Sequence, residues 1–297
     1  MVINALDEVL FWQDIAVIHE VIQDLTAKYH PHDPQSYFAE KKQFLQKTIP
    51  TKADFLRRLE HYAENGTPTW ISGRTDYCDD LGMNALKKAI HFSTPENGEQ
   101  KSAKAVSVLA RDPAFWTQYA NEILSKDKNT VLEMTIGAGL GTTAILRQMR
   151  PADMYFGVDI DFRCAKNADA LARHYQVNGL GITASLWNLP FDDNTFSTIC
   201  SNQGLEECRE IPTILAESVR VLQPGGKLVL HCLKTSHWVR YFTDYGFSDA
   251  EIYDWLCRLR VYAGIEQIDA ILLTQSMNPI TRKEDAAKGY IAVYEKI

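Results

Sequence analysis

The positions of the apolar residues predict two kinds of structure along the 297-residue chain. Before about residue 130, apolar residues recur every three or four positions, which predicts amphipathic helices. After that point short apolar runs alternate with amphipathic stretches, a pattern typical of a parallel sheet wrapped by helices. The chain therefore divides into a helical first part and an α/β second part.

Five helices are expected in the first part, and proline or glycine ends several of them. Four of them span residues 4–28, 35–47, 103–109 and 113–125. The other begins at Thr51, which forms a capping-box pattern with Asp54, and ends at Asn65 and Gly66. Its apolar stripe is Phe55, Leu56, Leu59 and Tyr62.

Residues 66–84 lack helical periodicity and are expected to form a loop. This loop contains Trp70, Arg74 and Tyr77. These side chains either line a binding cleft as a lid or pack on the neighbouring helices as part of a connector.

In the second part, strands are expected at residues 130–134, 154–158, 182–186, 198–201, 227–232, 267–274 and 289–295. Helices are expected between them at 142–148, 163–175, 211–221 and 249–261. Only four of the 16 glycines lie before residue 130, so tight turns belong mainly to this part. We expect a helical N-terminal domain over residues 1–128, acting as a substrate domain or lid, and an α/β domain over 129–297.

Composition and charge exclude several classes of protein. A hydrophobic content of 45% and a charged content of 23% are those of a globular chain, and no apolar run is long enough to span a membrane. The net charge of -7, with no basic run, argues against nucleic acid. The six cysteines form no C-x-x-C pair and the N-terminus lacks a signal-peptide pattern, so we expect reduced thiols, no metal site and a cytoplasmic protein.

The strongest local signal is a glycine-rich turn between a strand and a helix. Gly137, Gly139 and Gly141 alternate with other residues after the strand that ends near Met134. Such a turn lets the backbone approach a ligand closely. Asp159 ends the next expected strand, where a carboxylate can accept hydrogen bonds from the hydroxyls of a ribose. Together these features predict a nucleoside cofactor.

The same residues restrict the choice of cofactor. The turn has neither the G-x-G-x-x-G spacing of dinucleotide sites nor the lysine of a P-loop. Glu133 would repel a phosphate and attract a cationic ammonium group. A cofactor with a ribose and an amine therefore suits the turn better than NAD does.

Two further segments make a family resemblance specific. Residues 188–196 read NLPFDDNTF and residues 219–228 read VRVLQPGGKL. With the glycine turn and Asp159, their order resembles the class I S-adenosylmethionine-dependent methyltransferases over residues 130–232. The resemblance implies a doubly wound, Rossmann-like α/β fold with a seven-stranded sheet whose last strand is antiparallel.

The resemblance also implies roles for individual residues in binding S-adenosyl-L-methionine. Glu133 and the turn would hold the methionine part and Asp159 the ribose. Ile160 would lie against the adenine, with Ser185 and Leu186 at the adenine edge. Asn202 and Gln203 would lie next to the methyl group. The turn residues are Thr135, Ile136, Gly137, Ala138 and Gly139. Thr135 replaces a glycine that the family usually has, Ser185 replaces an aspartate, and Ser197 replaces another aspartate, for which we expect a structural role.

Candidate catalytic residues follow the expected fourth and fifth strands. Glu206, His231 and His237 could act as a general base for a hydroxyl acceptor, whereas an amine or a carboxylate needs none. Each also has a structural interpretation: Glu206, with Glu207, favours a helix N-terminus, His231 fits a core histidine, and His237 precedes an aromatic-rich packing segment.

The sequence therefore predicts an enzyme that transfers a methyl group to an oxygen or nitrogen atom of a small molecule or peptide, with no nucleic acid or membrane partner and with the oligomeric state left open. Three alternatives are kept. The chain could be a catalytically silent, methyltransferase-like binding subunit or an NAD-dependent oxidoreductase. It could also be an arsenite methyltransferase that uses Cys200 and Cys208.

Overall fold

The structure, a computed structural model, describes residues 51–65, 113–137, 139–160, 162–202, 204–233, 237–262, 264–284 and 289–297. The described residues belong to two compact units. One contains α3 (Lys52–Asn65) with residues 244–246, and the other contains residues 116–243 and 247–297. The other predicted N-terminal helices, apart from that at 113–125, lie outside the described residues, as do Trp70, Arg74 and Tyr77. The domain boundary at 128/129 stays a prediction.

A seven-stranded sheet forms the centre of the second unit, in the order β3-β2-β1-β4-β5-β7-β6. The strands are β1 (Thr130–Met134), β2 (Met154–Asp159), β3 (Asn178–Thr183), β4 (Phe196–Asn202), β5 (Leu222–Leu233), β6 (Met277–Glu284) and β7 (Gly289–Lys296). Pairings among β1 to β5 are parallel, whereas β7 is antiparallel to both β5 and β6. The prediction of a doubly wound sheet with an antiparallel last strand is confirmed.

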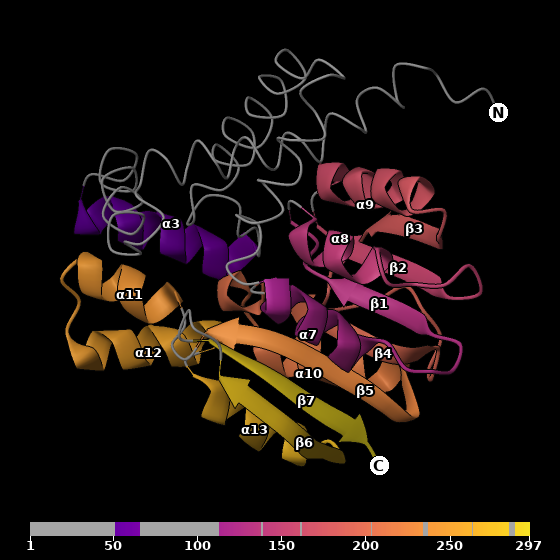
Figure 1. Cartoon of the computed structure of the whole chain (residues 1–297). Coiled ribbons are helices and arrows are strands. Elements are labelled where there is room, and N and C mark those ends of the chain that lie inside the picture. Colours follow the sequence, from indigo (N-terminus) through magenta and orange to yellow (C-terminus); the bar gives the residue numbers. More distant parts are fainter. Residues whose placement is uncertain are drawn as a thin grey trace. The chain divides into compact units, whose positions relative to one another are not determined.

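Helices lie on both faces of this sheet (Figure 1). The helices described after residue 112 are α7 (Pro113–Ile123), α8 (Leu140–Leu146), α9 (Phe162–His174), α10 (Ile211–Val221), α11 (His237–Asp244), α12 (Asp249–Leu259) and α13 (Ile265–Leu273). A short 3₁₀ helix, η3 (Leu205–Glu207), follows β4. Within the residues described, no helix has the length and apolar character needed to cross a membrane.

Alternation along the strands separates an apolar face from a face that carries polar residues. Leu132, Ile199 and Leu230 join the main apolar core, to which α10 and α13 contribute. Glu133, Cys200 and His231 are the next residues on the same three strands, and all three are buried. Because successive side chains point to opposite faces, these polar groups lie together on the face opposite the apolar core.

Three expectations about individual elements are wrong. The predicted strand 267–274 is helix α13, and the strand that follows it is β6. The predicted strand 182–186 overlaps only the end of β3, and α11 had not been expected. The errors arise because a short apolar run is compatible with either a helix or a strand. Pro279 is tolerated within β6 because β6 is an edge strand of the sheet.

The first unit contains one of the two backbone hydrogen bonds of the expected capping box. In α3 the Asp54 backbone N–H donates to Thr51 Oγ1 over 3.1 Å, and the Thr51 hydroxyl donates to Asp54 Oδ2 over 2.6 Å. Phe55, Leu59 and Tyr62 are fully buried, which confirms the predicted apolar stripe. The ring of Phe55 also stacks on that of Tyr245, within the same unit.

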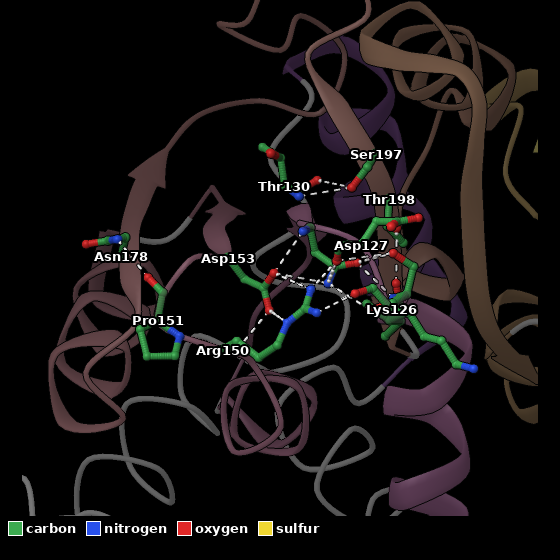
Figure 2. A network of polar contacts seen from close by, with 12 residues as sticks. Lys126, Asp127, Thr130, Arg150, Pro151, Asp153, Asn178, Ser197 and Thr198 are labelled. Atoms are coloured by element: carbon green, nitrogen blue, oxygen red, sulfur yellow. Dashed lines mark hydrogen bonds and ion pairs between the residues drawn. The ribbon is translucent and has the colours of Figure 1, made fainter.

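A network of polar contacts joins β1, β2 and the segment before β1 at the amino-terminal edge of the sheet (Figure 2). Asp153 Oδ1 accepts a hydrogen bond from the Asn129 backbone N–H over 2.8 Å, and its carboxylate is paired with Arg150. Arg150 also donates to the carbonyls of Lys126 and Asp127. One buried carboxylate thus organises the loop that connects α7 to β1.

Ser197 has the structural role expected from the sequence. Its Oγ accepts from the Thr130 backbone N–H over 2.9 Å and donates to the Thr130 carbonyl over 3.2 Å (Figure 2). A single hydroxyl therefore joins the beginnings of β1 and β4.

We expect Asp153→Asn to destabilise the second unit by about 2 kcal/mol at neutral pH. Burial alone would raise the pKa of the Asp153 carboxyl, but hydrogen bonds from Arg150 and Asn129 outweigh it and hold that pKa at about 2. Because this pKa is lowered, the stabilisation is present above the ordinary carboxyl range and disappears as the pH falls from about 4 to 2. Urea unfolding from pH 2 to 7 measures it. The exposed Asp254→Asn serves as the matched control, and equal stability loss in both variants would contradict the assignment.

Candidate active site

The glycine turn between β1 and α8 has the backbone conformation that its sequence requires. Gly137 and Gly139 have φ angles of 56° and 83°, in the left-handed region that glycine adopts without strain. The Gly139 N–H donates to the Ile136 carbonyl over 3.0 Å, which closes the turn. Ala138 lies outside the described residues. The turn therefore presents backbone rather than side chains where Gly137 and Gly139 stand.

Asp159 lies beside this turn at the end of β2. Its Oδ2 accepts a hydrogen bond from the Gly137 backbone N–H over 3.0 Å. The adjacent Ile160 is 50% exposed, although it is a large apolar residue. The structure thus brings together the carboxylate expected to bind a ribose and the turn expected to hold the remainder of the cofactor.

Glu133, at the end of β1, is only 1% exposed. Its Oε2 accepts hydrogen bonds from the Tyr155 hydroxyl of β2 and from the Thr142 hydroxyl of α8, each over 2.6 Å. Burial raises the pKa of the Glu133 carboxyl to about 7, against the opposing effect of these two hydrogen bonds, and the charge of Asp159 raises it further. Near neutral pH the protonated and ionised forms of Glu133 therefore have similar free energies.

The space over Gly141 is shared by two site residues. A Cβ on Gly141 would lie 2.6 Å from Glu133 Oε1, 3.2 Å from Asn202 Cβ and 3.5 Å from Asn202 Nδ2. Glycine is therefore needed here because the side chains of Glu133 and Asn202 converge on its α carbon. The turn, β1 and β4 meet at this point.

Asn202 also contacts the first of the candidate bases. Its Oδ1 lies 2.6 Å from Nδ1 of His231, which is 5% exposed and stands opposite Asn202 in the register of β4 and β5. The ring of Tyr119, from α7, lies edge-on to the imidazole with the centroids 6.3 Å apart. The imidazole is thus held by residues from two other elements.

Thr135 has a left-handed backbone, with a φ of 59°, which is unusual for a β-branched residue. Its hydroxyl donates to the Met134 carbonyl and contacts Ser201 Oγ at 2.9 Å. A Cβ on Gly204 would lie 2.0 Å from Thr135 Oγ1. The absent side chain of Gly204 therefore leaves room for the threonine that replaces the family's usual glycine.

Ser185 and Leu186 follow β3 at the same edge of the sheet. Ser185 Oγ accepts a hydrogen bond from the Trp187 backbone N–H over 3.2 Å, and Leu186 is buried in the main core. The Arg209 guanidinium lies 4.6 Å from the centre of the Trp187 ring, on which it stacks. This stack joins the segment after β3 to the segment after η3.

The other two candidate bases have different surroundings from His231. Glu206 is fully buried in η3. Burial raises the pKa of Tyr262 and of the Cys232 thiol, and the charge of Glu206 raises both further. Because Cys232 belongs to the main apolar core, Glu206 is near the face opposite His231. His237 begins α11. Gln203 lies outside the described residues.

Four residues near the site had not been singled out from the sequence: Tyr119, Thr142, Tyr155 and Gly204. Tyr155 and Glu133 occupy one face of adjacent parallel strands, because Tyr155 pairs with Val131 and Gly157 with Glu133. This relation follows from the strand register and could have been found once β1 and β2 were aligned. Tyr119 and Gly204 carry no local sequence signal.

The cysteines do not assemble a metal site in the part of the chain that is described. No group of three potential ligands occurs among those residues. Cys200 is fully buried, and burial raises the pKa of its thiol, while Cys208 donates to the Gly204 carbonyl over 3.4 Å. Nothing in this geometry favours the arsenite alternative.

Part of the chain is similar to known methyltransferases. Residues 132–230 match the family described as methyltransferase domain. A 2-phytyl-1,4-naphtoquinone methyltransferase of Nostoc punctiforme is 31% identical over 108 residues, 36% of this chain and 47% of the relative. A demethylmenaquinone methyltransferase of a Geobacillus species is 30% identical over 106 residues, 35% of this chain and 44% of the relative. The chain thus spans less than half the length of these relatives.

A solved structure supports the fold. The geranyl diphosphate C-methyltransferase from Streptomyces coelicolor A3(2) superimposes with a TM-score of 0.50 at 11% identity, covering 68% of this chain and 84% of that chain. Residues 132–230 are therefore similar to a methyltransferase domain, and the fold of the second unit agrees with this similarity. This match favours the methyltransferase interpretation over the alternative of an NAD-dependent oxidoreductase.

We expect the pH dependence of stability in the cofactor-free protein to reveal Glu133. Because its folded pKa of about 7 lies above the ordinary value of 4.5, the folded state holds a proton that the unfolded state releases between these values. Stability should therefore fall as the pH rises from 4.5 to above 7, by roughly 3 kcal/mol. Glu133→Gln should remove this component in thermal unfolding measured from pH 5 to 8. An identical pH slope in the variant would contradict the assignment.

A double-mutant experiment tests the relation between Thr135 and Gly204. Gly204→Ala should destabilise the protein by about 2 kcal/mol or more, because the new methyl group overlaps the threonine side chain. Thr135→Gly in the same chain should recover most of that loss, since it removes the overlap and suits the left-handed backbone. Additive effects in denaturant unfolding would show that the two positions are independent.

Proposed function

We propose that this protein is an enzyme that transfers a methyl group from S-adenosylmethionine to an oxygen or nitrogen atom of a small-molecule or peptide acceptor. The observation that carries the proposal is the hydrogen bond from the Gly137 N–H to Asp159. It places the carboxylate that is proposed to bind the ribose directly beside the glycine turn. The order of the strands supports the location. The strand order runs outward in one direction from β1 through β2 to β3, and in the other direction from β4 to β5, so the chain switches direction between β1 and β4. Ligands of open α/β sheets bind at the carboxyl ends of the strands beside such a switch point.

The residues present fit the cofactor. Asp159 is expected to accept hydrogen bonds from the ribose hydroxyls, and the exposed Ile160 offers an apolar surface to the adenine. The turn from Thr135 to Gly139 would lie along the methionine part. The buried charge of Glu133 favours a nearby ammonium group when the carboxyl is ionised. Ser185 and Leu186 would lie at the adenine, and Asn202 and Gln203 next to the methyl group.

When bound, the cofactor supplies a methyl group on a positively charged sulfur. Methyl transfer of this kind is an in-line displacement in which charge disperses, so the protein contributes mainly orientation and exclusion of water. His231 is the favoured base for a hydroxyl acceptor, since it lies on β5 beside Asn202 of β4. Glu206 and His237 are the weaker candidates. Glu206 is fully buried close to Cys232 and Tyr262.

A small molecule is the favoured acceptor. The matched relatives are named for quinone substrates, which are small molecules. The net charge of -7 opposes nucleic acid as a partner. We propose a cytoplasmic location because the cysteines show no disulfide-framework pattern. The N-terminal 128 residues are proposed to shape the acceptor site as a substrate domain or lid.

Asp159→Ala tests the cofactor site. Loss of charged hydrogen bonds to the ribose should weaken S-adenosylmethionine binding by about 10- to 100-fold. Isothermal titration calorimetry measures this, and the exposed Asp192→Ala provides the control of equal chemical change. Unchanged affinity in Asp159→Ala would remove Asp159 from the site.

The activity itself is tested by incubating the protein with methyl-labelled cofactor and fractionated extract of the source cell, with mass spectrometry to locate the label. The expected result is a labelled small molecule whose yield is much lower with Asp159→Ala when the cofactor concentration is below saturation. Tight cofactor binding without label transfer to any fraction would instead support the alternative of a silent binding subunit.

A further inference from the structure

We infer that Asn202 is a positioning residue that fixes the tautomer and orientation of His231, so that Nε2 receives the proton of a hydroxyl acceptor. This inference rests on the proposed function. It assigns to Asn202 a role different from the contact with the cofactor's methyl group that the family resemblance implies.

The first argument is the hydrogen bond itself. Asn202 Oδ1 lies 2.6 Å from His231 Nδ1, and a side-chain amide oxygen can only accept. Nδ1 must therefore carry the hydrogen. In the neutral imidazole the lone pair is then on Nε2, which is the nitrogen that can take a proton.

The second argument concerns the orientation of the amide. Asn202 Nδ2 lies 3.5 Å from the position of a Cβ on Gly141, and Glu133 Oε1 lies 2.6 Å from the same position. The donor end of the amide is thus on the side of the buried carboxylate, and the acceptor end is on the side of His231. An inverted amide would place its oxygen near the Glu133 carboxyl and its NH₂ against Nδ1, so the ionised form of Glu133 favours the observed orientation.

The third argument is confinement. His231 is 5% exposed, and the Tyr119 ring of α7 lies edge-on to it. Among the described residues, the other titratable groups on this side of the sheet include the Cys200 thiol of β4, the Glu133 carboxyl of β1, and the hydroxyls of Tyr119 and Tyr155. Burial raises the pKa of Tyr119, Tyr155, Cys200 and Glu133. The neighbouring strand β7 presents Ile291 opposite His231 in the register.

The proton and electron balance of the step is complete with these groups. The acceptor O–H bond breaks and its proton passes to His231 Nε2, while the acceptor oxygen forms a bond to the methyl carbon. The carbon–sulfur bond breaks, and its electron pair stays on sulfur, which becomes a neutral thioether. Asn202 retains its hydrogen bond to Nδ1–H throughout and stabilises the imidazolium that forms.

The experiment combines histidine NMR with kinetics on the full chain. Proteins labelled with ¹⁵N-histidine are compared as wild type, Asn202→Ala, and Asn202→Asp, which keeps an acceptor for Nδ1. The His231 signals are assigned by their absence in His231→Gln. Asn178→Ala, at the opposite edge of the sheet, is the matched control for an asparagine truncation.

In the wild type and in Asn202→Asp we expect the Nδ1–H tautomer. In Asn202→Ala the Nε2–H tautomer should become populated. With a hydroxyl acceptor, Asn202→Ala should lower kcat by at least about 10-fold, whereas cofactor affinity by calorimetry should stay within about 3-fold. Asn178→Ala should match the wild type in all three measurements.

An Nε2–H tautomer in the wild type overturns the inference, as does an Asn202→Ala tautomer identical to the wild type. A loss confined to cofactor affinity would also overturn it and would assign Asn202 to cofactor binding alone. If Asn202→Ala does not fold, the tautomer of His231 in the wild type still tests the inference. Failure of the proposed function gives a different result. In that case the wild type transfers no methyl group although its His231 has the Nδ1–H tautomer.

Discussion

The buried carboxylate of Glu133 is the constraint on which the rest of the site depends. Tyr155 and Thr142 donate to one of its oxygens, and the other lies over Gly141, so β1, β2 and the start of α8 are fixed relative to one another by a single side chain. A carboxylate in this position is unfavourable unless it is hydrogen-bonded. The hydroxyl donors and the missing Cβ together make its burial possible, and they also determine where the glycine turn can run.

Much of the α/β domain could be predicted because its signals are local. The glycine turn, Asp159 and the strand alternation each follow from a few adjacent residues, and the predicted sheet topology came from the family resemblance they carry. The errors fell where local information was insufficient: the run from Ile265 to Leu273 is apolar enough for either a strand or a helix, and its contacts with the core decide for the helix. The pairing of Asn202 with His231 depends on the register of β4 and β5, which no segment encodes alone.

Departures from the family pattern were visible in the sequence, but their compensation was not. Thr135 was identified as replacing a glycine, and its left-handed backbone shows that the turn kept its geometry despite the side chain. The compensating feature is Gly204, separated by almost 70 residues and placed beside Thr135 only by the fold. A side chain at a position with a left-handed backbone can thus be accommodated by a glycine at the neighbouring position, without a change of backbone conformation.

The antiparallel strand β7 also has a consequence for the order of folding. Although β7 follows β6 in sequence, it lies between β5 and β6 in the sheet. Until the β6–β7 pair docks, β5 is an unprotected edge strand, and such edges are prone to pairing with other chains. The candidate base His231 belongs to β5, and β5 is paired on both sides only after β6 and β7 have docked. Nascent or truncated chains without β6 and β7 would therefore have an incomplete candidate site and an exposed, aggregation-prone strand edge.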